Sequence, residues 1–161
     1  MTTEVQADLD RIDAQYELLV FKEFDERTAR ALGNLVLEHA GHEPVIVDIR
    51  RGDDLLYFGA NPGTSPANAD WARRKRNLVN KLQVASYAVG LHEKLGTNII
   101  DLMALDRRDY TAHGGCFPIR VVGAGIVGTI TVSGLPQRDD HKLATDCIAE
   151  LIGVDLGNAA F

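Results

Sequence analysis

Histidine side chains are the first candidates for chemistry in this sequence, because imidazole exchanges a proton near neutral pH and also binds metal ions. Three of the five histidines have informative neighbours. His113 precedes two glycines at the entrance to a β-rich run, where the backbone can come close to a bound molecule. His39 lies on the apolar stripe of a predicted helix, and His141 follows two aspartates at the start of another. Each could ligate a metal ion or carry a proton, or it could be hydrogen-bonded within the fold.

A run of four cations, RRKR at residues 73–76, is the next candidate. It stands near the start of a predicted helix, where positive charge opposes the helix dipole, so helix stability does not explain it. Four consecutive helical residues sweep about 300° around the axis, so they cannot all face solvent. Arg74 and Lys75 are predicted to lie on the side of Trp71 and Leu78. We therefore expect an anionic group beside them; pairing with neighbouring Asp or Glu side chains is the alternative.

These features predict a cleft between the first half of that helix and the segment 113–116, near Ser133 and Gly134. Backbone N–H groups at the glycines could contact a bound anion there. The predicted ligand-binding residues are Trp71, Arg74, Lys75, His113, Gly114, Gly115, Ser133 and Gly134. No Ser-His-Asp set, H-E-x-x-H motif or close carboxylate pair can be assigned from spacing, so the sequence does not support hydrolytic chemistry. Whether the protein is an enzyme stays open.

Residues 123–128 read GAGIVG and match the dinucleotide-binding pattern G-x-G-x-x-G. In that motif the glycines must open a helix, whose N-terminus holds the pyrophosphate. Here six of the seven residues from Ile126 to Val132 are β-branched, three on each face, which is typical of a strand. We interpret Gly123 to Gly125 as the turn of a β-hairpin, and we expect neither NAD nor FAD to bind.

Composition and charge restrict the class of protein. With 161 residues, 45% hydrophobic and 25% charged, the chain fits one globular domain. A net charge of −6 disfavours nucleic acid and anionic membrane surfaces as partners. Cys116 and Cys147 form no C-x-x-C pair, and the acidic N-terminus does not resemble a signal peptide. We therefore expect a cytoplasmic protein with reduced thiols.

Hydrophobic periodicity and turn residues predict an α+β domain, in which helices pack on an antiparallel sheet. A first helix is expected at about 3–16 and a core at about 18–152. The predicted elements of the core are a connector at 18–21, a helix from the cap Asp25 to about 41, a hairpin at 44–59, a long helix from 66 to about 95, a short strand or turn at 99–105, a polar loop at 106–113, a hairpin at 117–133 and a helix at about 139–152. Apolar or β-branched residues on both faces of the hairpins predict self-association, because one set of helices covers only one face.

Five motifs together support a family resemblance. They are WARRKR (71–76), SY (86–87), HGGCFPI (113–119), GIVG (125–128) and SGLPQRDDH (133–141). In these motifs the chain resembles the HbpS-like haem-degrading domains, relatives of GlcG and of the C-terminal domain of PduO-type adenosyltransferases, over about residues 18–152. The resemblance implies a profilin-like fold, with a central antiparallel sheet and helices on both faces, and a homo-oligomer. It also implies haem as a candidate cofactor, since relatives bind haem through a histidine and some are reported to degrade it.

Two classes of function follow from the sequence. The first is a binding protein or enzyme for haem or another small anionic molecule, with Trp71 as an apolar wall and Arg74 and Lys75 facing carboxylates. His113 or His39 would then be the iron ligand or proton carrier, and His141 is a third candidate ligand. The second class is a non-catalytic, oligomeric interaction protein.

Overall fold

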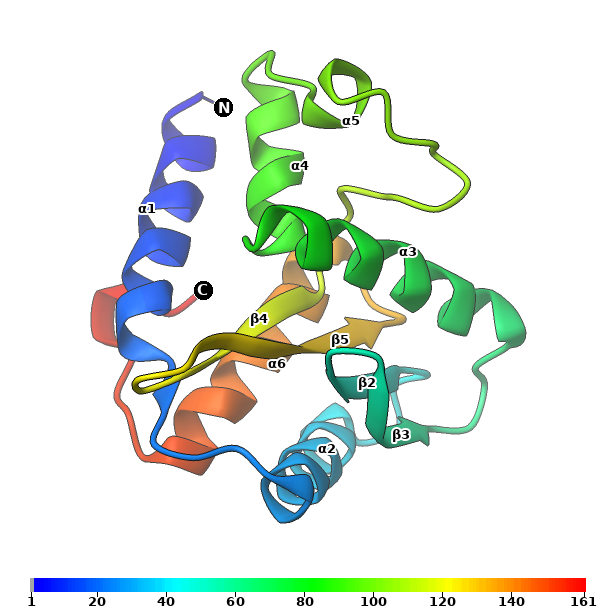
Figure 1. Ribbon diagram of the computed structural model, residues 1–161, viewed down its shortest axis with the longest axis vertical. Coiled ribbons are helices and arrows are strands. Elements are labelled where there is room, and N and C mark those ends of the chain that lie inside the picture. The colour runs from blue at the N-terminus through cyan, green and yellow to red at the C-terminus, as the bar shows by residue number, and fades with distance from the viewer. Residues whose placement is uncertain (1) are drawn as a thin grey trace.

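The computed structural model describes residues 2–161 (Figure 1). Over those residues, six α-helices, five strands and one 3₁₀ turn follow each other along the chain. They are α1 (Thr2–Leu18), β1 (Val20–Phe21), α2 (Glu26–Ala40), β2 (Ile46–Arg51), β3 (Asp54–Ala60), α3 (Pro66–Leu82), α4 (Ser86–Lys94), α5 (Ile99–Leu102), β4 (Cys116–Val121), β5 (Gly125–Ser133), α6 (Gln137–Ile152) and the 3₁₀ turn Gly157–Ala159. The predicted α+β class is confirmed. Within residues 2–161, no helix is both long and apolar enough to cross a bilayer.

The strands form one sheet in the order β1-β4-β5-β2-β3. The two predicted hairpins, β2–β3 and β4–β5, are antiparallel, and β2 and β5 join them through a third antiparallel pairing. The short strand β1 pairs in parallel with β4, with Val20 opposite Arg120, so the sheet is mixed. The segment that the sequence indicated as a connector therefore supplies one edge of the sheet, and β3 forms the other.

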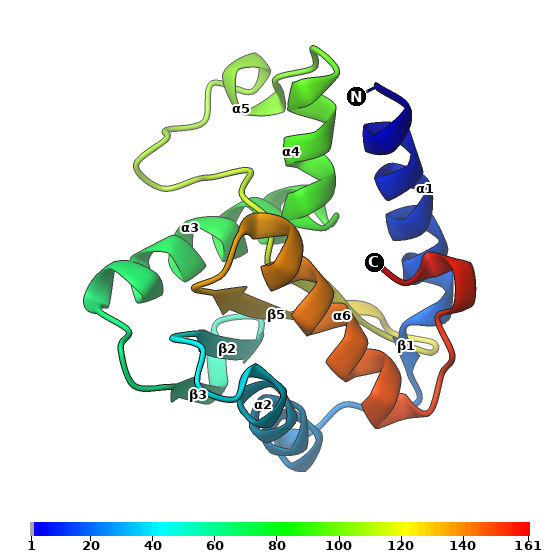
Figure 2. The ribbon, with the colours of Figure 1, turned by 180° about the vertical axis from the view of Figure 1, so that it is seen from behind.

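Helices cover both faces of this sheet, as the family resemblance implied. Helices α2 and α6 pack on one face and α3 packs across the other. Accordingly, α6 lies behind the strands in Figure 1 and in front of them in Figure 2, where the molecule is turned by 180°. Helices α1 and α4 stand side by side beyond the end of the sheet, joined by a hydrogen bond of 3.0 Å from Tyr87 to Asp8.

The two faces of the sheet differ in polarity. Side chains alternate along a strand, so Val47 and Ile49 enter the apolar core with α2 and α6, whereas Asp48 points toward α3. Asp48 is buried there and pairs with Arg76 of α3 at 3.3 Å. Thr131 lies opposite Asp48 on β5 and is buried beside it. At the sheet centre the second face is therefore polar and covered, whereas the sequence predicted an uncovered face that would drive self-association.

The long helix predicted from residue 66 to about 95 is two helices. Its start is as predicted: Ser65 is the N-cap, and Asn68 completes a capping box with it. The helix ends at Leu82 because Gln83 adopts a left-handed conformation, with φ of 61°, and its N–H bonds the carbonyl of Val79. A non-glycine residue in this conformation leaves little signal in a sequence. The segment after it also differs from prediction, since residues 99–102 form the short helix α5 instead of a strand or turn.

The GAGIVG segment forms the predicted hairpin turn. Gly123 and Gly125 have positive φ angles of 76° and 75°, which glycine adopts readily. Strand β5 begins at Gly125 and pairs antiparallel with both β4 and β2. No helix follows these glycines before residue 137, so the segment lacks the strand-to-helix geometry of a dinucleotide-binding loop.

Candidate functional site

A pocket of about 240 Å³ lies where α3, the segment before β4, the end of β5 and the start of α6 meet. Its lining residues are Asn68, Trp71, Lys75, His113, Ser133, Gly134, Leu135, Gln137 and Asp140. Five of the residues predicted to bind a ligand line it: Trp71, Lys75, His113, Ser133 and Gly134. We call this cavity the Trp71–His113 pocket.

Lys75 and Asp140 form a buried ion pair within the lining of this pocket. Lys75 Nζ lies 3.0 Å from Asp140 Oδ2, and it also donates to the carbonyl oxygen of Val132 at 3.0 Å. The other carboxylate oxygen of Asp140 accepts the N–H of Leu135 at 2.9 Å. The side chains of Lys75 and Asp140 are only 3% and 2% exposed. Burial lowers the pKa of Lys75 and raises the pKa of Asp140, because it disfavours the charged form of each group.

This pair changes the charge expected at the site. The sequence predicted a positively charged cleft on the basis of Arg74 and Lys75, but Asp140 balances the charge of Lys75. Asp140 could not be assigned from the sequence, because it is 65 residues from Lys75 and only the tertiary fold joins them. The available signal was indirect: the helical sweep placed Lys75 inward, and a buried lysine requires an acidic partner.

Arg74 lies outside the pocket lining. Its guanidinium carbon stands 4.7 Å from the centre of the Trp71 ring, a cation–π arrangement. Its Nε and Nη2 atoms donate to the carbonyl oxygen of Arg107 at 3.1 and 2.7 Å, so Arg74 ties the loop after α5 to α3. The other two cations of the run also have protein partners, Arg73 with Asp109 and Arg76 with Asp48. The alternative noted for the basic run, pairing within the protein, therefore describes it better than a free anion site.

The rings of Trp71 and His113 contact each other at one side of the pocket. Their ring centres are 4.7 Å apart and the ring planes are tilted by 47°. Burial lowers the pKa of His113, and the charges of Lys75 and Arg74 lower it further. The imidazole is therefore neutral at pH 7, with a lone pair available to accept a proton or to ligate a metal ion.

The glycines of the site serve close packing of the chain. A Cβ atom at Gly114 would lie 2.4 Å from the carbonyl oxygen of Gln137, and one at Gly115 would lie 2.2 Å from that of Val132. The N–H of Gly114 already donates to Gln137 Oε1 at 3.2 Å, so the predicted role as a free donor to a ligand is not available to it. At Gly134, a Cβ would come within 2.3 Å of the carbonyl oxygen of Pro44. Glycine is required at these positions by neighbouring backbone.

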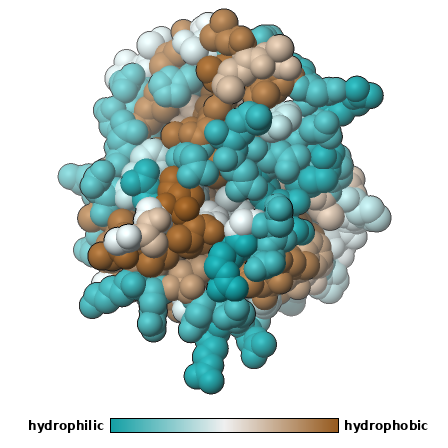
Figure 3. Space-filling view, in the orientation of Figure 1, coloured by the Kyte–Doolittle hydropathy of each residue, from teal (hydrophilic) through white to brown (hydrophobic). Residues whose placement is uncertain are grey.

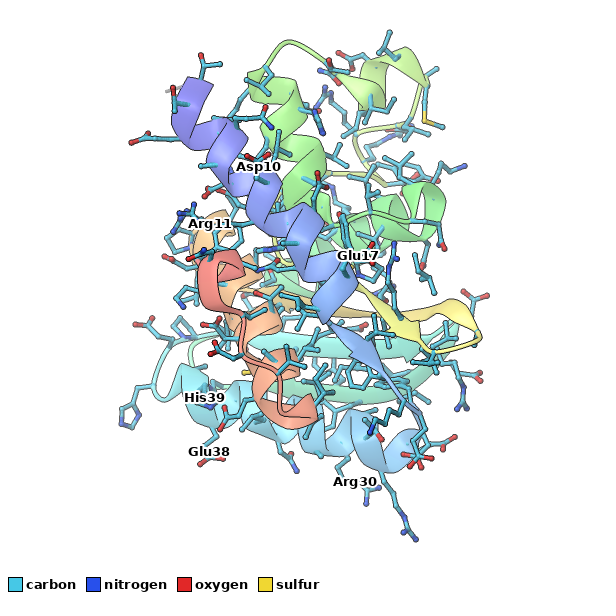
Figure 4. All side chains as sticks on the ribbon, turned by 90° about the vertical axis from the view of Figure 1, so that its left-hand side faces the viewer. Asp10, Arg11, Glu17, Arg30, Glu38 and His39 are labelled. Atoms are coloured by element: carbon cyan, nitrogen blue, oxygen red, sulfur yellow. The ribbon has the colours of Figure 1, made fainter. Side chains whose placement is uncertain are left out.

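His39 lies in a different pocket. That pocket, of about 310 Å³, is formed between α2 and α6, and it shares only Leu135 with the Trp71–His113 pocket. His39 projects from α2 close to α6 (Figure 4), and its Nε2 atom is 2.5 Å from Glu150 Oε2. A metal ion at His39 would have to displace this carboxylate or share it. The candidate histidines His39 and His113 therefore lie in two different pockets.

His141 is a core residue, contrary to its prediction as a possible iron ligand. It is completely buried, and its ring contacts the rings of Tyr87, Phe117 and Phe161. His141 Nε2 donates to Gln15 Oε1 at 2.9 Å, because an amide oxygen can only accept, and the amide nitrogen of Gln15 donates to the carbonyl oxygen of Ala159. His141 Nδ1 has no partner among the described residues. Burial lowers the pKa of His141 to about 3, so the ring is neutral.

This burial predicts a pH-dependent loss of stability. The unfolded chain binds a proton at His141 near the ordinary pKa of 6.5, whereas the folded protein does so only near 3. Below pH 6.5 the free energy of unfolding should fall by up to about 1.4 kcal/mol per pH unit from this group. Denaturant titrations of the wild type and His141→Gln between pH 7 and pH 4 measure the effect. A smaller slope in the variant is expected; equal slopes would contradict the assignment.

Comparisons with known proteins agree with this fold. Residues 24–149 match the model of the family described as "Haem degrading protein HbpS-like". The chain is 45% identical over 148 residues to a UPF0303 protein of Azotobacter vinelandii, with 90% of this chain and 89% of the relative covered. It is 42% identical to a UPF0303 protein of Acidobacterium capsulatum, with 92% of each covered.

Solved structures show the same fold at low sequence identity. The crystal structure of the Ybr137w protein matches with a TM-score of 0.83 at 21% identity and covers 94% of both chains. A PduOC:heme complex matches with a TM-score of 0.69 at 18% identity, over 83% of this chain and 97% of that one. HbpS matches with a TM-score of 0.63 at 19% identity, over 81% and 91%. These likenesses show the fold, and the family match over residues 24–149 shows that the chain belongs to the HbpS-like haem degrading protein family.

Proposed function

We propose that this protein binds a small molecule in the Trp71–His113 pocket. The observation that carries the proposal is the convergence of an aromatic ring, a neutral imidazole and a buried ion pair from separate segments of the chain on one small cavity. A few polar groups placed around an aromatic wall are typical of ligand sites. Two of these polar groups, Lys75 and Asp140, are held in place by their hydrogen bonds within the protein and need no ligand to position them.

The charge and size of the pocket define the class of ligand. Lys75 and Asp140 balance each other, and Arg74 is held by the carbonyl of Arg107, so the lining offers hydrogen bonds and no free cation. The cavity of about 240 Å³ is below the range of about 300–1,000 Å³ common for larger ligands. These features favour a small polar molecule with oxygen acceptors over a large anion.

Haem, the ligand suggested by the family, fits this pocket in part. His113 presents a neutral imidazole that could ligate iron, and the aromatic ring of Trp71 lies beside it. When bound, haem would supply an iron centre for redox or oxygen chemistry. However, the cavity cannot enclose a macrocycle, and the expected partners of the propionates, Arg74 and Lys75, are already paired. Haem would therefore have to lie at the mouth of the pocket, against His113.

Trp71 provides a direct test, because it is the single tryptophan of the chain and its fluorescence reports on the pocket. Titration with small carbonyl, hydroxyl and carboxylate compounds should give a saturable change in emission for at least one neutral polar compound. His113→Ala should weaken that binding by about tenfold, the effect of losing one good hydrogen bond. His39→Ala is the matched control and should bind normally. A change in emission that never saturates, or equal binding by both variants, would contradict the proposal.

Haemin forms a separate arm of the same experiment. If haem binds through His113, a saturable Soret shift should be lost in His113→Ala and retained in His39→Ala. Loss only in His39→Ala would move haem to the pocket between α2 and α6. A shift that is unchanged in both variants would exclude both histidines as the iron ligand.

A second candidate function is self-association for a structural role, and the exposed edge strand favours it. Leu55 and Phe58 of β3 are 52% and 47% exposed. In Figure 3 hydrophobic surface appears at the lower right, where β3 lies in Figure 1. Strand β3 pairs only with β2 in the part of the chain that the structure describes, so its other edge can accept a strand from a second copy.

This candidate predicts a homo-oligomer that depends on β3. Light scattering of the wild type should give a mass above that of one chain, and Phe58→Lys should lower it, because a charge on the apolar edge opposes association. Leu102→Lys is the control, since Leu102 is 74% exposed on α5, away from this strand. A monomer mass for the wild type from micromolar to millimolar concentration would contradict self-association.

A further inference from the structure

Lys75, the lysine in the Trp71–His113 pocket, lies in an environment that suits a reactive amine as well as an ion pair. Lys75 Nζ has three hydrogens, and the structure gives it two acceptors, Asp140 Oδ2 and the carbonyl oxygen of Val132. The lysine and its carboxylate partner both line the cavity, so the ion pair faces a space that can hold a ligand.

The absence of a side chain at Gly115 leaves room for the Lys75 nitrogen. A Cβ atom there would stand 2.9 Å from Lys75 Nζ, closer than nonbonded atoms pack. The side chain of Lys75 is 3% exposed, so it is shielded from bulk water, and the residue lines the cavity. Water exclusion matters because an imine, the product of an amine and a carbonyl, is hydrolysed in water.

We propose that Lys75 is an amine nucleophile that forms an imine with an aldehyde or ketone group of a small ligand. This inference rests on the Trp71–His113 pocket being the ligand site, as proposed above, and it specifies the ligand class. Desolvated lysines that lie in a pocket beside an acid–base partner are typical of this chemistry. The carbonyl class also agrees with a neutral, polar pocket of small volume.

Asp140 supplies the proton transfers for the reaction. The ammonium of Lys75 passes one proton along the 3.0 Å hydrogen bond to Asp140 Oδ2, which leaves a neutral amine. The nitrogen lone pair then forms a bond to the carbonyl carbon as the C=O π bond breaks, and Asp140 returns its proton to the oxygen, which becomes a hydroxyl. The nitrogen gives a second proton to Asp140, which passes it to the hydroxyl; the hydroxyl leaves as water and the C=N bond forms. Overall, ammonium and carbonyl give a protonated imine and one water, so no oxidant or reductant is needed.

Burial assists the first of these transfers. The pKa of Lys75 is lowered and that of Asp140 is raised, in both cases because water is excluded from the charged group. Both shifts bring the neutral pair closer in free energy to the ion pair. His113 lies in the same lining as a neutral base that can relay a proton to the departing oxygen.

Reductive trapping tests the inference. The wild-type protein is incubated at pH 7 with glycolaldehyde, a small neutral aldehyde, and cyanoborohydride, and each lysine is quantified by peptide mass spectrometry over time. The chain contains four other lysines as internal controls, Lys22, Lys81, Lys94 and Lys142. Lys75 should be modified faster than each of these, because its lowered pKa leaves more of it as free amine at pH 7, and its rate should saturate with glycolaldehyde. Modification of the exposed lysines before Lys75 would overturn the inference.

A variant and a second readout separate this inference from the proposed function. Asp140→Asn should slow trapping at Lys75 and leave the other four lysines unchanged; equal rates at Lys75 would remove Asp140 from the reaction. Trp71 fluorescence is recorded in parallel with glycolaldehyde in the absence of cyanoborohydride. Saturable binding without trapping at Lys75 would overturn the imine and leave the ligand pocket standing. Failure of both readouts, together with failure of the ligand panel, would overturn both.

Discussion

The ion pair between Lys75 and Asp140 is the interaction on which the arrangement of the site depends. A lysine and an aspartate that are 3% and 2% exposed cannot remain charged without each other, because removing a single charge from water costs several kcal/mol. The pair joins α3 to the start of α6, and the bond from Lys75 to the carbonyl of Val132 joins both to β5. Three elements distant in sequence are thereby fixed around one cavity.

The pair belongs to a wider polar layer between α3 and the sheet. On the opposite face, α2 and α6 bury a continuous apolar core, whereas under α3 the sheet presents groups such as Asp48, which Arg76 and Arg50 both contact. Buried charges in such a layer need partners, so the ion pair between Arg76 and Asp48 restricts the position of α3 on the sheet. The apolar face thus supplies most of the burial energy, and the polar face supplies the site.

Sequence patterns among neighbouring residues predicted much of the fold. The features that they did not predict depend on contacts between residues far apart in the sequence. Asp25 and Ser65 were recognised as helix caps because capping depends on neighbours three residues away. The break at Gln83 was not predicted because no helix-breaking residue marks it in the sequence. The chain turns there as α4 packs on α1. For the site, helical geometry placed Trp71 and Lys75 on one side, but it could not place Asp140, and so the charge of the pocket was predicted wrongly.

A double-mutant cycle on the free energy of unfolding at pH 7 tests the central role of the pair most directly. Lys75→Met and Asp140→Leu should each destabilise the protein by about 3–5 kcal/mol, because each leaves a buried group without its partner. The double variant should be destabilised by much less than the sum, since it removes both groups. Single variants within about 1 kcal/mol of the wild type, or strictly additive losses, would contradict the account.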